Sequence, residues 1–125
     1  MTRFALAVCL MLLFFPVPGA AQTDPVARGG SAVYPGIDVN IGSPEGLRRL
    51  HVAFEAQCVD VKSAEAAVGP EVREAVLLLL RDQTVAGLAT PQGKRRLKEA
   101  LAATINRVIG GPRVVRVLFL QFVII

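Results

Sequence analysis

The sequence predicts a small α+β domain in which helices pack on a short β-sheet, and three observations indicate this fold class. Apolar and polar residues alternate over residues 37–41 and again over residues 50–58, which is typical of half-buried strands. Two stretches of helical periodicity follow within residues 70–109. Residues 113–125 are rich in β-branched and aromatic side chains, which favour a closing strand. Strands and helices segregated in this way are typical of an α+β domain.

The length and bulk composition indicate a single small domain. The chain has 125 residues and a formal net charge of +4, which gives room for one domain with a modest core. The basic residues do not alternate with aromatic stacking positions, so nucleic acid is not an expected partner. Of the two cysteines, Cys9 lies in the apolar N-terminal run and Cys58 would be alone in the domain, so no intrachain disulfide is expected.

The N-terminus resembles an export signal. Arg3 precedes an unbroken apolar run over residues 4–15, followed by Pro16, Pro18 and small residues up to Ala21. This pattern predicts a signal peptide over residues 1–21, and a retained membrane anchor is the alternative. Residues 22–36 contain Pro and Gly with little periodicity and are expected to form a linker, which leaves residues 37–125 as the domain.

In the strand over residues 50–58, Cys58 is expected on the core face with Val52 and Phe54, whereas His51 is expected on the opposite, solvated face. Ser63 can cap a short helix that ends at Gly69.

Pro70 can open the next helix, whose apolar stripe contains Val72, Val76, Leu79 and Leu80. Leu77 and Leu78 widen this stripe, so the helix is expected to be buried on most sides or to contact a partner.

The last helix has clear start and stop signals. Thr90 is the expected N-cap, Pro91 takes the first helical position, and Gly110 with Gly111 ends the helix. Its basic cluster consists of Lys94, Arg95, Arg96 and Lys98. Such a cluster is either a solvated face or a docking patch for an acidic partner or anionic lipid.

The closing strand is apolar on both faces, with Val115, Val117, Phe119 and Val123 on one and Val114, Leu118, Leu120, Phe122 and Ile124 on the other. We therefore expect it either in the centre of the sheet or at a protein interface. The main elements then follow the order ββααβ.

No arrangement typical of an active site is found in the sequence. His51 is the only histidine, and strand alternation separates it from Cys58, so these two residues are not expected to bind a metal together. Nucleophile elbows, phosphate loops and dinucleotide-binding fingerprints are absent from the sequence. We therefore predict no catalytic, cofactor-binding or metal-binding residues, and no small-molecule substrate.

Five short motifs follow one another in the second half of the chain. They are Val-Arg-Glu-Ala-Val-Leu at residues 72–77, Thr84 with Leu88, Thr-Pro-Gln-Gly-Lys at 90–94 with Leu97, Ile105-Asn106, and Val-Leu-Phe-Leu-Gln-Phe-Val-Ile at 117–124. In this order and spacing they resemble the C-terminal half of the FliL family of flagellar basal body-associated membrane proteins. The resemblance implies a stomatin-like (SPFH-like) domain without catalytic activity.

For this chain, the resemblance implies a place on the periplasmic face of the bacterial inner membrane, at the flagellar basal body. The implied partners are the chain itself, in a homo-oligomer or ring, the flagellar stator and basal-body proteins, and the inner membrane. The implied role is support of motor torque, motility and chemotaxis. Lys94, Arg95, Arg96, Lys98, Leu77 and Leu78 are the candidate contact residues. Family members typically keep a membrane anchor, so a cleaved signal would favour the alternative, a free periplasmic binding module or small enzyme.

Overall fold

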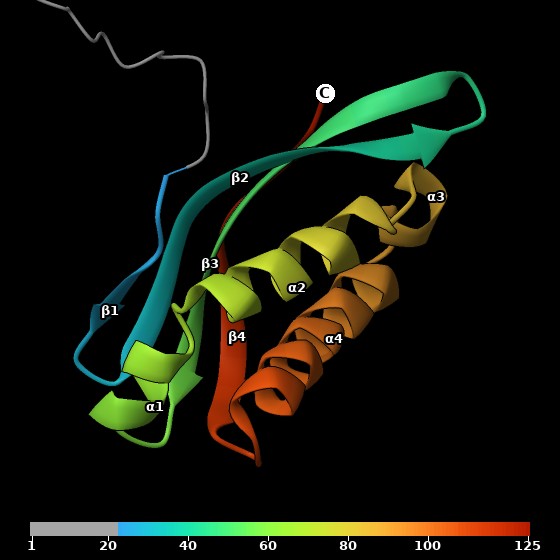
Figure 1. Ribbon diagram of the computed structural model, residues 1–125. Helices are drawn as coiled ribbons and strands as arrows, with labels where there is room; N and C mark the ends of the chain where they lie inside the picture. Colours follow the sequence, from blue (N-terminus) through green and yellow to red (C-terminus); the bar gives the residue numbers. More distant parts are fainter. Residues whose placement is uncertain (1–22) are drawn as a thin grey trace, which may run out of the picture.

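The computed structural model describes residues 23–125, which form a four-stranded antiparallel sheet with the two long helices on one of its faces (Figure 1). The strands lie in the order β1-β2-β3-β4. In chain order the elements are β1 (Val26–Arg28), β2 (Ser31–Ser43), β3 (Gly46–Cys58), α1 (Val61–Ala66), α2 (Pro70–Arg81), α3 (Val85–Leu88), α4 (Pro91–Ile109) and β4 (Val114–Ile124).

The α+β class is confirmed, but the element order ββααβ is incomplete. Three strands precede the helices, because the segment expected to be a linker carries β1 and the first part of β2. Val26 pairs with Val33 across a turn in which Gly29 has a φ of 59°, a conformation that favours glycine. Tyr34 is only 2% exposed. The glycines and prolines there mark a turn and an irregularity in the ladder rather than a linker.

The predicted signal or anchor, residues 1–21, lies outside the described residues. Across residues 23–125, no helix combines the length and the apolar character needed to cross a membrane.

Strand β4 lies at the edge of the sheet, which excludes the central position, one of the two alternatives that the sequence left open. Ala53 pairs with Gln121 and Phe54 pairs with Phe119, which leaves Leu120 as an extra residue in β4. A second register shift, between Gln57 and Cys58, leaves an extra residue in the same way at Val115. Each of these β-bulges inserts one residue and reverses the alternation of side chains.

The two bulges correct the predicted faces of β4. The residues that pair with the inward-facing positions of β3 are Val114, Val117, Phe119, Phe122 and Ile124. Simple alternation assigned these five residues to two faces, because a bulge does not show in the apolar pattern. The strand therefore has one face toward the helices, and Val115 and Leu120 remain exposed.

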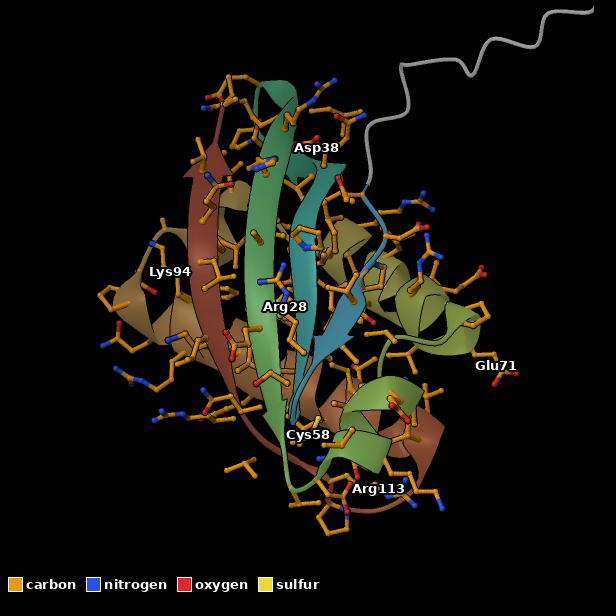
Figure 2. The ribbon with its side chains drawn as sticks, turned by 90° about the vertical axis from the view of Figure 1, so that its left-hand side faces the viewer. Arg28, Asp38, Cys58, Glu71, Lys94 and Arg113 are labelled. Carbon is orange, nitrogen blue, oxygen red and sulfur yellow. The ribbon has the colours of Figure 1, made fainter. Side chains whose placement is uncertain are left out.

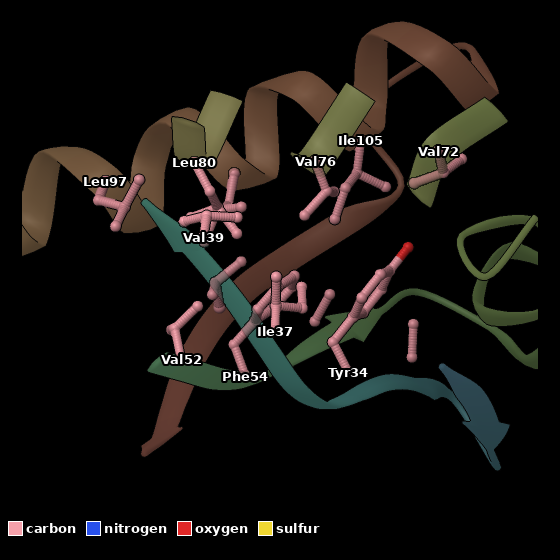
Figure 3. Packing of buried hydrophobic residues seen from close by; sticks show 14 of the residues in the cluster. Tyr34, Ile37, Val39, Val52, Phe54, Val72, Val76, Leu80, Leu97 and Ile105 are labelled. Carbon is pink, nitrogen blue, oxygen red and sulfur yellow. The ribbon is translucent and has the colours of Figure 1, made fainter. Parts of the chain in front are cut away.

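The core lies between the sheet and the pair α2 and α4 (Figure 3). From the sheet, Tyr34 stacks on Phe54 with ring centroids 4.6 Å apart and an interplanar angle of 8°. The helices contribute the apolar positions that the sequence predicted, and those fully buried are Val72, Val76 and Leu80 from α2 and Leu97, Leu101 and Ile105 from α4. Burial of each such side chain contributes about 1.5–3 kcal/mol to folding.

Side-chain caps fix the helix ends. Thr90 is confirmed as the N-cap of α4, since its Oγ1 accepts the Gly93 backbone N–H at 3.0 Å. Helix α1 begins differently from the prediction: Asp60 is its N-cap and accepts the backbone N–H of Ser63 at 2.8 Å. Ser63 itself is buried in the first turn.

Candidate functional site

An exposed apolar strip runs along β4. Val115, Leu120, Val123 and Ile125 are 64%, 52%, 47% and 68% exposed. Two of them, Val115 and Leu120, are the extra residues of the bulges and do not follow the regular alternation of inward and outward side chains. We call these four residues the β4 edge. Exposed apolar side chains on an edge strand, which has a neighbouring strand on one side only, are typical of an interaction surface.

The predicted basic cluster on α4 divides into two pairs. Lys94 Nζ lies 5.3 Å from the centroid of the Phe122 ring, and Lys98 Nζ lies 5.4 Å from that of Phe119. Both lysines are half-buried, and Lys94 also donates a hydrogen bond to the Leu88 carbonyl at 3.2 Å. These contacts fix two of the four cations over the inner face of β4.

The other pair, Arg95 and Arg96, is exposed. Figure 2 shows Lys94 beside β4, on the side of the strand away from β3. The first turns of α4 therefore bring positive charge next to the β4 edge. The sequence predicted this basic cluster on the last helix, but only the packing of α4 on β4 shows that the cluster lies beside β4.

Leu77 and Leu78, the other predicted contact residues, have different surroundings. Leu77 is half-buried and packs against the core. Leu78 is 57% exposed and lines an open groove of about 570 Å³ between α2 and α4, together with Arg81 and Arg107. The structure thus places Leu78 on the α2 side of α4, whereas Lys94 and Lys98 lie on its β4 side.

His51 is on the solvated face as predicted, yet it has partners that the sequence did not reveal. Its Nδ1 lies 2.7 Å from Asp38 Oδ1 and its Nε2 lies 2.9 Å from Gln121 Oε1. The hydrogen bonds to Asp38 and Gln121 raise the pKa of His51. The pairing of β2 with β3 could have suggested the Asp38 contact, but the bulge at Leu120 hides the position of Gln121.

Cys58 is half-buried rather than fully buried, and its Sγ lies 3.6 Å from the Ala56 carbonyl oxygen. Burial and the nearby Asp60 carboxylate raise the pKa of the thiol, which keeps it protonated. Within residues 23–125, no three side chains of the metal-binding types gather into a group that could hold a metal ion.

Comparison with known protein families gave a match over most of the described residues. The model of the family described as flagellar basal body-associated protein FliL matches residues 33–124. The matched region begins within β2 and extends through the last residue of β4, so it contains the core, the basic cluster and most of the β4 edge. A search of curated proteins gave no match. The family match spans well over half of the 125 residues, and the chain therefore belongs to the FliL family of flagellar basal body-associated proteins.

Proposed function

We propose that this chain is a non-catalytic accessory protein of the flagellar basal body that associates with itself and with stator units on the periplasmic face of the inner membrane. Its role is to support motor torque and, through it, motility and chemotaxis. The β4 edge beside the basic start of α4 is the observation that carries the proposal. Family membership supports the basal-body location.

The shape of the β4 edge favours contact through side chains. Bulges at Val115 and Leu120 interrupt the ladder, and bulges on edge strands hinder the addition of another strand. The same bulges turn apolar side chains outward. A partner that packs on this surface buries apolar area without continuing the sheet.

The exposed arginines give the surface a preference for negative charge. Arg95 and Arg96 project from the first turns of α4, near the lysines that cover β4. An acidic patch on a second copy or on a stator protein would complement them. The self-association that we propose is a ring in which neighbouring domains lie side by side.

Motility of a strain that carries the altered gene tests this role. The substitutions Leu120→Ser and Val123→Ser, introduced together, should reduce swimming in soft agar toward the level of a deletion strain, with normal expression. Arg95→Glu with Arg96→Glu should do the same. Leu47→Ser is the matched control, because Leu47 is 71% exposed at the tip of the β2–β3 hairpin and lies outside the β4 edge.

Cross-linking in cells then distinguishes self-association from stator binding. Loss of the homo-oligomer band in the Leu120 and Val123 variant supports self-association, and loss of stator recruitment to the motor supports stator binding. Wild-type swimming and cross-linking in both double variants would contradict the proposal. Fractionation of a C-terminally tagged chain shows whether residues 1–21 are removed, and full mass in the membrane fraction is the outcome that the motor role predicts.

A further inference from the structure

Three polar residues from three neighbouring strands meet on the sheet face opposite the helices. Asp38 on β2 and His51 on β3 are directly opposite each other in the ladder, and Gln121 comes from β4. Figure 2 views this face and shows Asp38 on it. The imidazole lies between a carboxylate oxygen at 2.7 Å and an amide oxygen at 2.9 Å. It therefore links the edge strand β4 to β3, which carries the ring, and to β2 on the far side of β3.

The arrangement of oxygens favours the protonated ring. An imidazolium has two N–H donors and satisfies both Asp38 and Gln121 as they stand. A neutral imidazole has one N–H, so the lone pair on its other nitrogen would face an oxygen. Loss of the proton therefore breaks one contact or forces the Gln121 amide to rotate and donate instead.

The other charged groups on this face do not replace Asp38 as the partner of His51. They are Arg28 from β1, Arg49 and Glu55 from β3, and Arg116 from β4. Arg116 donates to Gln57 at 2.9 Å, near the other end of β4. Gly36 of β2 lies beside the ring, since a Cβ at this position would be in van der Waals contact with His51 Cε1 at 3.4 Å.

We propose that His51, Asp38 and Gln121 form a proton-sensitive clasp that holds β4 firmly to the sheet when His51 is protonated and loosens it when His51 is neutral. The direction follows from linkage. The folded-state pKa of His51 lies above its ordinary value, so the added stability is complete below about pH 6.5 and is lost as the pH rises through the folded-state pKa. The clasp does not depend on the proposed function, although the strand it holds carries the β4 edge.

The first test is an NMR titration of the imidazole. His51 is the only histidine of the chain, so its ring signal is unambiguous. The wild-type pKa should exceed that of the urea-unfolded chain, and Asp38→Asn should lower it. Glu55→Gln is the matched control: it removes one carboxylate from the same face, four residues along β3, and should leave the pKa nearly unchanged. Gln121→Glu should raise the pKa.

The second test asks whether the proton controls β4. The amides to follow are those of Val123 and Ile125, because the Ile125 N–H donates to the Arg49 carbonyl of β3 at 2.8 Å and Val123, two residues away, faces β3 in the same way. Their hydrogen exchange, corrected for intrinsic rates, should show about two- to fivefold greater protection at about pH 5.5 than at about pH 8.5, the scale expected for a partly exposed ion pair. His51→Gln should remove this dependence on pH while leaving the protection of the β2 amides unchanged.

Two results would overturn the clasp. One is a wild-type pKa of His51 at or below the unfolded value. The other is a pH-dependent protection of the Val123 and Ile125 amides that persists in His51→Gln. If that variant does not fold, the comparison of Asp38→Asn with Glu55→Gln decides the question by the same two measurements.

Discussion

The side chain of Asn106, near the end of α4, accepts a hydrogen bond from the backbone N–H of Val114, the first residue of β4, over 2.8 Å. The same Oδ1 accepts the N–H of Arg113 at 2.9 Å. Between these residues the chain reverses through Gly110 and Gly111, whose φ angles are 87° and 98°. One amide oxygen therefore fixes where the closing strand begins.

Replacing Asn106 by Ala should destabilise the domain. The part-buried Val114 N–H would lose its acceptor, and an unsatisfied group of this kind costs about 1–3 kcal/mol where water does not replace it. The Arg113 N–H would lose one of two acceptors, since it also donates to the Gly111 carbonyl at 2.9 Å. We expect a loss of about 1–3 kcal/mol in the free energy of unfolding, measured by urea denaturation. Asn106→Asp keeps an acceptor oxygen and should lose clearly less. Equal losses in the two variants would show that the acceptor is not what matters.

The side chain of Tyr34 connects the sheet to the C-terminal end of α1 through a hydrogen bond. Its hydroxyl donates a buried hydrogen bond to the Ala67 carbonyl at 2.7 Å, and burial raises the pKa of the phenol, so it stays protonated as a donor. Tyr34→Phe should cost about 0.5–1.5 kcal/mol in urea unfolding, the usual net value of such a bond. Tyr34→Leu also removes the stack on Phe54 and should cost more. A Phe variant as stable as the wild type would contradict this role.

Gly93 allows α4 to approach α3. A Cβ at this position would collide with the backbone carbonyl of Gly87, which cannot move without shifting α3. Gly93→Ala should therefore lower the melting temperature despite the better helix propensity of alanine, and overpacking of this kind typically costs about 1–3 kcal/mol. Gly42→Ala is the control, because its Cβ would meet nothing within 4 Å. Similar melting temperatures for both variants would rule out the collision.

Lys98 should contribute to stability through the Phe119 ring. Lys98→Met keeps an unbranched side chain over the ring but removes the charge, and it should cost about 0.5–1 kcal/mol, the value of an exposed cation–π contact. Arg96→Met, which changes an exposed cation of the same helix, should be close to neutral. Both are read from the midpoint of urea unfolding. A larger effect at Arg96 than at Lys98 would contradict the assignment of the two pairs.

Local signals in the sequence were enough for α4 and for the inward faces of β2 and β3. Thr90 and Pro91 start α4 and Gly110 ends it as predicted, because capping and backbone conformation depend on neighbours within one turn. The alternation around Val39 and Val52 likewise identified the inward faces of β2 and β3. The motifs of the second half also identified the family.

Prediction failed where distant parts of the chain meet. Strand β1 is only three residues long, and it depends on the pairing of Val26 with Val33. This pairing leaves no local pattern, so the prolines and glycines around β1 suggested a linker. The width of the apolar stripe on α2 did not reveal that Leu78 is exposed, since that depends on where α4 packs.

The sequence by itself determined the fold class, the start of α2, both ends of α4, most of the core and the family, because these follow from periodicity, capping and motif spacing. Only the tertiary structure decided the surface of β4. The bulges at Val115 and Leu120 depend on pairing with β3, and they select which apolar side chains face solvent and bring Gln121 to His51. Alternation along a strand has a fixed period of two, and an extra residue that shifts it is specified by the partner strand rather than by the local sequence.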